Sequence, residues 1–353
     1  MDNARKNAKK YAPFLIYKKL ESMVILPVRH TPGRHCGSTG IRDLIDFHGL
    51  DFDEPMCFGI GAGLGLWYLK GGRLPASRMI HVRSLDLEHQ FFTRIGTPFA
   101  WRQYENPQDS EDDLRACLDK GRPAIIQTDI YHLPYYQSRT HFPGHLITVW
   151  GYDAKDRVFF VTDTERPDIQ TVSFEEMKAA RFSGGGIFDL RGNLFAPESL
   201  PAPNDDLPEI IRQAIAYNSR VLLDNGLETQ GLRALAAWQA DLDAWPDFED
   251  WQWTARLAYQ IIAKRGTGGG GFRLMYHDFL MTARKILKGT ISQNMIDRMA
   301  RAAASWTGLA EALKSASEKT VPDFSAVLIR LRQVIEDETA FHETAVKLAT
   351  PPD

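Results

Sequence analysis

Short apolar runs separated by turn residues dominate the chain from residue 22 to about residue 195. Three of these runs, at 124–130, 146–152 and 158–162, are rich in β-branched and aromatic residues and predict strands. The four residues between the second and third runs form a turn signal, so these two strands are expected to pair as a hairpin. A last strand is expected at 187–190. The pattern therefore predicts an antiparallel sheet in this part of the chain.

Helical periodicity begins before the predicted sheet. Apolar positions at helical spacing predict a helix over 38–47, with Ser38 or Thr39 as its N-cap. A second helix is expected to start at Asp53, which precedes a glutamate and a proline. With helices first and the sheet after them, the predicted fold class is α+β.

Two capping signals mark further short helices. A helix over 110–120 begins with Ser110 and Asp113, which are spaced like a capping box. Ser173 and Glu176 form a second such pair.

The pattern becomes long and helical after the proline-rich segment 200–203. We therefore predict a boundary there, between a first domain over 22–200 and a mainly α-helical bundle over 201–353. The helices expected in the bundle are 206–224, 228–243, 246–264, 271–288, 290–317 and 322–349.

Composition and charge narrow the classes of function. The chain has 353 residues, and its 42 Lys and Arg against 45 Asp and Glu give a formal charge of −3, which offers no global basic excess for nucleic acid. Its three cysteines are scattered and predict neither a disulfide framework nor a cysteine-rich metal site. A reducing compartment fits these cysteines. The basic N-terminus is followed by too short an apolar run for a signal peptide, and no apolar stretch is long enough to span a bilayer, so we expect a cytoplasmic protein without membrane partners.

Three residues have the types and the order of a cysteine-dependent catalytic site. Cys36 lies at the start of a predicted helix, where the helix dipole favours a thiolate. His145 begins one strand of the predicted hairpin and Asp163 follows the other, so antiparallel pairing is expected to bring them together. A cysteine, an imidazole and a carboxylate in this arrangement form a nucleophile, a base and a group that orients the base. The alternative for Cys36 alone is an inert structural cysteine.

Other side chains are candidates for binding the substrate or its oxyanion. His30 and His35 lie close to Cys36 in sequence and could donate to an oxyanion, or they could be ordinary surface residues. Tyr135, Tyr136 and His141 belong to an aromatic segment that could line a cleft, or could form a packed surface loop.

Three further motifs do not support a cofactor. The glycines at 59–65 fit no dinucleotide-binding pattern and are better explained by close backbone packing beside the helix that contains Cys36. The glycine run at 266–271 lacks the lysine of a phosphate-binding loop. His141 and His145 are spaced like a metal pair, but Pro143 and Gly144 between them oppose a helix, so no metal site and no cofactor are expected.

Basic residues gather in the C-terminal part. Most such clusters are solvated helix faces, but this one could also dock an acidic carrier protein. The candidate docking residues are Lys264, Arg265, Arg273, Arg284 and Lys285.

Several motifs together resemble a known family. They are His35-Cys36-Gly37-Ser38-Thr39, Phe47-His48-Gly49, Glu54, Phe58-Gly59-x-Gly61-x-Gly63-Leu64, Gly144-His145 and Gly151-Tyr152-Asp153. This set is similar to that of the butirosin biosynthesis protein H acyltransferase family. The C-terminal segment Gly268-Gly269-Gly270-Gly271-Phe272-Arg273-x-x-Tyr276-x-x-Phe279-Leu280 resembles the helical domain usually fused to it.

The resemblance implies a papain-like cysteine fold that transfers an acyl group from a carrier-protein thioester to an amine of an aminoglycoside. It implies that Cys36 is acylated, that His145 is base and acid, and that Asp163 orients His145. The expected donor is a phosphopantetheine thioester on a carrier protein or coenzyme A, and the expected acceptor is a small-molecule amine in natural-product biosynthesis. Two alternatives stay open: a cysteine amidase, peptidase or thioesterase with the same three residues, and a non-catalytic protein that binds a ligand or a carrier.

Overall fold

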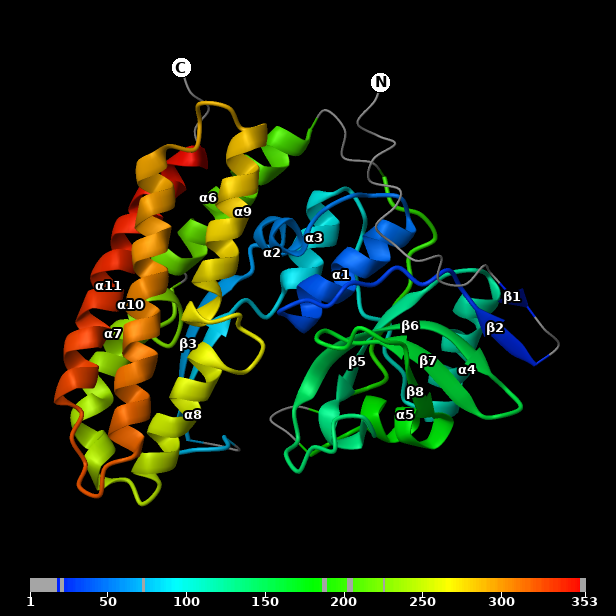
Figure 1. Cartoon of the computed structure of the whole chain (residues 1–353), viewed down its shortest axis with the longest axis horizontal. Helices are drawn as coiled ribbons and strands as arrows, with labels where there is room; N and C mark the ends of the chain where they lie inside the picture. Colours follow the sequence, from blue (N-terminus) through cyan, green and yellow to red (C-terminus); the bar gives the residue numbers. More distant parts are fainter. Residues whose placement is uncertain are drawn as a thin grey trace. The chain divides into compact units, whose positions relative to one another are not determined.

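The computed structural model describes residues 18–19, 22–71, 74–185, 189–201, 206–224 and 226–349. The chain forms two compact units (Figure 1). The first consists of Met1–Phe52 and Phe99–Leu200, and the second consists of Asp53–Pro98 and Pro201–Asp353. This division differs from the expected single boundary near residue 200, because 53–98 packs with the C-terminal helices. Among the described residues, no helix has the length and apolar character needed to cross a membrane.

The first unit is built on an antiparallel sheet whose central strand is β6 (Pro143–Asp153). β6 pairs along one edge with β5 (Ala124–Asp129) and then with β2 (Met23–Ile25). Along its other edge it pairs with β7 (Val158–Thr162). The remaining strands are β1 (Lys18–Lys19), β8 (Gln170–Ser173) and β9 (Leu194–Phe195). The predicted hairpin of β6 and β7 is therefore confirmed.

Helices cover both faces of this sheet (Figure 1). The first face receives α1 (Cys36–Phe47) at Gly40, where an added Cβ would lie 2.2 Å from the side chain of Leu146. The other face carries the apolar core shared with α4 (Pro107–Asp119) and α5 (Phe174–Arg181). Alternation along β6 explains this arrangement, because successive side chains of a strand point to opposite faces.

Several predicted helix starts in this unit move by a few residues. The helix expected from residue 38 begins at Cys36, because the side chain of His35 accepts a hydrogen bond from the N–H of Ser38 and caps it. The helix expected over 110–120 begins at Pro107 with Asn106 as its cap. The capping box of Ser173 and Glu176 is confirmed.

The strand expected at 187–190 is not found as such. Residues 186–188 lie outside the described part of the chain, and 189–190 are not in a strand. The short strand β9 at Leu194–Phe195 pairs with β5 instead.

The second unit is mainly helical. It contains the hairpin β3 (Leu64–Lys70) and β4 (Arg78–Arg83), with α2 (Glu54–Ile60) and α3 (Leu87–Arg94) on either side of it in the sequence. Its C-terminal helices are α6 (Leu207–Leu223), α7 (Gly231–Asp241), α8 (Trp251–Ala263), α9 (Arg273–Ile286), α10 (Gln293–Ser317) and α11 (Ser325–Ala345). All six lie within a few residues of their predicted ranges, because their apolar stripes run uninterrupted to glycine or proline breaks. The start of α2 after Asp53 is also confirmed.

The glycines at 59–65 pack closely inside this second unit. A Cβ on Gly59 would lie 2.2 Å from the ring of Phe279 in α9, and one on Gly65 would lie 2.3 Å from the carbonyl oxygen of Arg83. Close backbone packing is therefore the correct explanation, but its partners are α9 and β4. The expectation that the Cys36 helix is the partner is replaced by these contacts.

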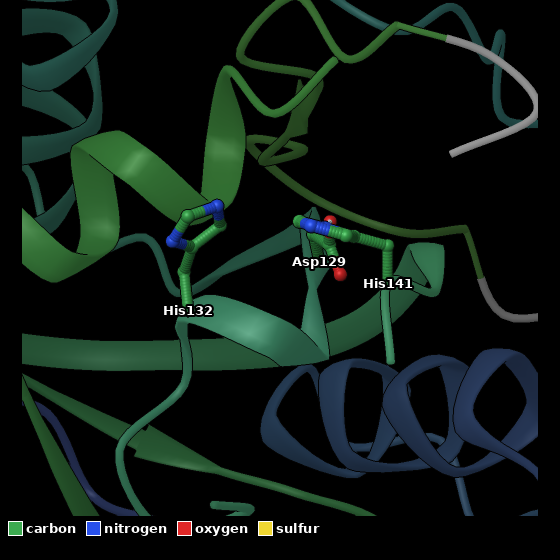
Figure 2. Close-up of side chains that lie close together, drawn as sticks. All are labelled: Asp129, His132 and His141. Atoms are coloured by element: carbon green, nitrogen blue, oxygen red, sulfur yellow. Dashed lines mark hydrogen bonds and ion pairs between the residues drawn. The ribbon is translucent and has the colours of Figure 1, made fainter. Parts of the chain in front are cut away.

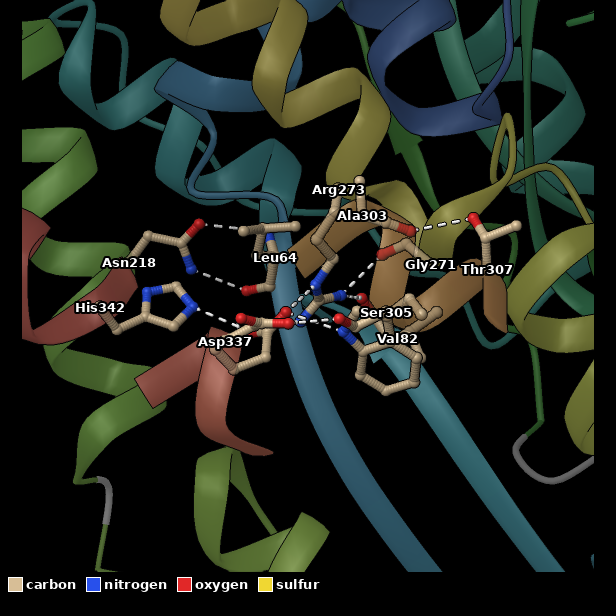
Figure 3. Close-up of polar contacts among 12 residues, drawn as sticks. Leu64, Val82, Asn218, Gly271, Arg273, Ala303, Ser305, Thr307, Asp337 and His342 are labelled. Atoms are coloured by element: carbon tan, nitrogen blue, oxygen red, sulfur yellow. Dashed lines mark hydrogen bonds and ion pairs between the residues drawn. The ribbon is translucent and has the colours of Figure 1, made fainter. Parts of the chain in front are cut away.

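A buried ion pair links the elements of the second unit (Figure 3). The guanidinium of Arg273 is fully buried and binds both carboxylate oxygens of Glu338 in α11, at 2.7 and 3.1 Å. It also donates to the carbonyl oxygens of Val82 and Gly271. Trp306 in α10 donates its indole N–H to Glu338. Four of these contacts connect β4, α9, α10 and α11, and the fifth joins Arg273 to Gly271 just before α9.

Candidate active site

The candidate active site lies in the first unit, where α1 meets the sheet. Cys36 is the first residue of α1 and is partly exposed. His145 lies near the start of β6 and Asp163 directly follows β7. Since β6 and β7 pair antiparallel, the end of β7 lies beside the first half of β6. The structure thus brings together the residues that the sequence predicted to meet.

The imidazole of His145 is held by the carboxylate of Asp163. Its Nε2 lies 2.8 Å from Oδ1 and 3.0 Å from Oδ2 of Asp163. Its ring also takes part in a hydrogen bond with the side chain of Cys36. Because Nε2 is engaged by Asp163, Nδ1 is the nitrogen that remains for the sulfur. This is the geometry of an oriented base next to a nucleophile.

The charges in this site reinforce one another. Burial alone lowers the pKa of His145, but the Asp163 carboxylate and the Cys36 sulfur outweigh it and raise the pKa to about 10. Burial alone would raise the pKa of Asp163, but attraction to His145 and the hydrogen bonds that it accepts lower it. Near neutral pH the arrangement therefore favours a protonated His145 between the Asp163 carboxylate and the Cys36 sulfur.

Two tyrosines complete the surroundings of Asp163. The hydroxyl of Tyr135 donates to Oδ2 at 2.8 Å, and that of Tyr136 lies 3.3 Å from Oδ1. The N–H of Thr164 donates to Oδ1 at 2.7 Å. Burial, followed by the neighbouring carboxylate, raises the pKa of both tyrosines, so they remain donors. In the structure these two residues contact the Asp163 carboxylate directly, a contact that was not predicted from the sequence.

Two family models match the chain. The description "Butirosin biosynthesis protein H, N-terminal" covers residues 35–164, a range that contains Cys36, His145 and Asp163. Residues 35–164 belong to the butirosin biosynthesis protein H N-terminal family. A second model, described as "Domain of unknown function (DUF4872)", covers residues 175–345. A comparison with curated proteins finds no match.

Two candidate oxyanion donors have other partners in the structure. His30 places Nδ1 2.5 Å from Oδ2 of Asp43 and Nε2 2.8 Å from the carbonyl oxygen of Arg166. Both of its ring nitrogens therefore have partners, and His30 links α1 to the segment after β7. This link replaces the oxyanion role that was expected of His30. His35 uses Nδ1 to cap α1. Histidine is an uncommon cap, so no local signal in the sequence indicated this function.

His141 belongs to a different cluster from the one that holds Cys36. Its Nδ1 lies 2.7 Å from Oδ2 of Asp129, the last residue of β5. Asp129, His132 and His141 place one ligand atom each within 4.8 Å of one another. Asp129 was not among the predicted site residues, although a carboxylate at the end of a predicted strand, just before an aromatic and histidine-containing segment, was a usable signal.

The basic residues of the second unit do not form one exposed set. Arg273 is fully buried against Glu338, so it is not a docking residue. Arg284 is half-buried and donates to the side chain of Gln293. Lys264, Arg265 and Lys285 are exposed. These three stay candidates for contact with an acidic partner.

Proposed function

We propose that the protein transfers an acyl group from a thioester to an amine through a Cys36 acyl-enzyme. The observation that supports this most directly is the buried His145–Asp163 pair next to a cysteine at the first position of α1. A helix that presents its cysteine to an antiparallel sheet bearing the histidine is also the arrangement expected of a papain-like enzyme. Membership in the butirosin biosynthesis protein H family supports a role in antibiotic biosynthesis.

In the first half-reaction the Cys36 thiolate attacks the thioester carbonyl. A carbon–sulfur bond forms to Cys36, and the bond to the donor sulfur breaks. His145, as imidazolium, gives its proton to the departing thiol. Cys36 lies at the N-terminal, positive end of the α1 dipole, so the helix start is suited to stabilise the oxyanion of the tetrahedral intermediate.

In the second half-reaction a neutral amine attacks the Cys36 acyl carbonyl. His145, now neutral, takes one proton from the attacking nitrogen and becomes imidazolium again. The carbon–sulfur bond to Cys36 breaks, which releases the amide and restores the thiolate. Asp163 keeps the imidazole in one orientation and stabilises its charged form in both steps. No cofactor is required beyond the phosphopantetheine arm of the donor.

The test is the intact mass of the protein after brief exposure to a panel of acyl thioesters. We expect a one-acyl mass increase in the wild type and in Cys57→Ala, which removes a cysteine from the other unit, and no increase in Cys36→Ala. The adduct should form more slowly in His145→Ala. Loss of the adduct on addition of an amine, with formation of the amide, supports transfer.

Three outcomes would contradict the proposal in different ways. An adduct that water removes as fast in the presence of amines as in their absence indicates a hydrolase. Absence of any adduct, while Cys36 is still alkylated readily, indicates that thioesters are not the donors. A folded protein in which Cys36 resists alkylation indicates a binding protein.

We further propose that an acidic carrier protein delivers the acyl group and contacts the exposed bases Lys264, Arg265 and Lys285. The variant Lys285→Glu should raise the apparent KM for a carrier-borne thioester and leave the KM for a small thioester mimic unchanged. Equal effects on both donors would contradict carrier docking. Lys155→Glu, in the β6–β7 turn of the first unit, is the matched charge-reversal control.

A further inference from the structure

A cluster of three potential metal ligands lies where β5 ends and β6 begins (Figure 2). Asp129 is the last residue of β5, and His132 ends the short 3-10 helix that follows it. His141 lies just before β6. One ligand atom from each of the three lies within 4.8 Å of the other two. The cluster therefore joins two segments of the first unit and includes none of the residues proposed to react.

The carboxylate of Asp129 is fixed in position. Its Oδ1 accepts from the backbone N–H groups of Tyr131, at 3.1 Å, and Phe142, at 2.8 Å. Its Oδ2 accepts from the hydroxyl of Ser183 at 2.7 Å and faces Nδ1 of His141. The group is thus a rigidly held oxygen ligand.

Both imidazoles are placed by the ring of Tyr131. The His141 ring stacks on it at a centroid distance of 4.1 Å, and the His132 ring meets it edge-on at 5.0 Å. The two imidazole centroids are 5.9 Å apart. The His141 side chain is 35% exposed, so an ion from solvent has access to the cluster.

We propose that Asp129, His132 and His141 bind a divalent transition-metal ion, with water completing the coordination. Two imidazole nitrogens and one carboxylate oxygen are a ligand set typical of zinc, whereas magnesium and calcium favour oxygen ligands alone. The ion replaces the proton between Oδ2 of Asp129 and Nδ1 of His141, and this proton passes to solvent. A turn of the His132 side chain brings its nitrogen to bonding distance.

The surroundings of Asp129 match what a metal site needs around its ligands. Hydrogen bonds to ligand atoms hold them in orientation, and Ser183 and the two backbone N–H groups supply these bonds to the carboxylate. Asp129 pairs with Pro143, and the preceding Thr128 pairs with His145. A bound ion would therefore tie down the segment that leads into the strand carrying His145.

The experiment uses the full-length protein with Co²⁺ and Zn²⁺ as the probes. Cys36→Ala serves as the parent, because a cysteine next to a histidine binds these ions by itself. We expect one ion per chain by calorimetry, and a Co²⁺ spectrum with ligand-field bands and no thiolate charge-transfer band. His132→Ala should weaken binding by more than about 100-fold, and Ser183→Ala by about 10- to 100-fold, as is usual for a group that orients a ligand.

His277→Ala is the matched control. His277 belongs to the second unit, where its Nδ1 lies 3.7 Å from Oδ1 of Asp278. Replacing His277 should leave metal binding unchanged. The proposal is overturned if Cys36→Ala binds neither ion, or if His132→Ala binds as tightly as its parent. Since His132 is half-buried, its truncation is expected to leave the fold intact, and circular dichroism checks this.

Discussion

The substitution Asp163→Asn tests the electrostatic basis of the site. It removes the negative charge beside His145 and keeps the size of the side chain. With Asp163 present, the pKa of His145 is raised from 6.5 to about 10 in spite of burial. Without it, burial still opposes the charged imidazolium, so the pKa of His145 is expected to fall below neutrality. Cys36 then loses the imidazolium that stabilises its thiolate.

The magnitude follows from the thiolate population. In the wild type we expect Cys36 to be largely thiolate at pH 7. An ordinary thiol with a pKa of about 8.5 is only a few per cent thiolate at that pH, so alkylation should slow by about 30-fold in Asp163→Asn. The difference should shrink as the pH rises through the pKa of the unassisted thiol.

The assay is the rate of Cys36 alkylation by iodoacetamide, followed by intact mass from pH 5 to pH 10. Asp168→Asn makes the same change at an exposed position after β7 and should react like the wild type. If a folded Asp163→Asn variant is alkylated at the wild-type rate at pH 7, the proposed thiolate–imidazolium pair is refuted.

Two predictions concern the second unit. Gly59→Ala places a Cβ 2.2 Å from the Phe279 ring and should destabilise the protein by about 1–3 kcal/mol in urea unfolding, whereas Gly308→Ala, with no contact closer than 3.6 Å, should stabilise it by about 0.5–1 kcal/mol. Arg273→Met should cost about 3–5 kcal/mol near neutral pH, because it removes the buried cation that binds both carboxylate oxygens of Glu338. Burial alone would raise the pKa of Glu338, but Arg273 and the other partners of Glu338 lower it. The stability that ionised Glu338 contributes is therefore present above the pKa that this group has in the unfolded chain, and it is lost as the pH falls. In Arg273→Met the buried Glu338 prefers the neutral form, so the stability gap between variant and wild type should narrow in acid; thermal unfolding at pH 7 and pH 4 measures this.

Either of these predictions has a clear contrary outcome. Equal stability of the two alanine variants would show that the space around Gly59 relaxes without cost. A stability gap for Arg273→Met that stays constant or widens from pH 7 to pH 4 would show that Glu338 is not the group that loses its partner.

The sequence predicted those elements whose signals are local. The six C-terminal helices and the β6–β7 hairpin follow from uninterrupted periodicity and from turn residues, and both are present. His145 and Asp163 could be paired in advance because antiparallel strands constrain distance along the chain. The helix that begins at Cys36 was found from its apolar stripe, but not its cap.

What the sequence did not predict depends on contacts between distant segments. Nothing local distinguishes Arg273, which is buried against Glu338, from the exposed bases nearby. Residues 53–98 end about a hundred residues before the domain boundary predicted near residue 200. Only the packing of β3 and β4 against helices after residue 201 assigns residues 53–98 to the second unit. The short strand β9 was missed for the same reason, since its pairing partner β5 is about seventy residues earlier.

The division into two discontinuous units has a consequence for the order in which the protein is made. During synthesis Cys36 and the hairpin of β3 and β4 leave the ribosome early, yet the hairpin buries Tyr68 against Trp238, more than a hundred and fifty residues later. The apolar face of the hairpin therefore stays without its packing partners until the C-terminal helices have been synthesised. Fragments ending near residue 200 would retain the proposed reactive residues but lack the partners of the inserted segment, so full-length chains are the appropriate unit for expression and for recombination between relatives.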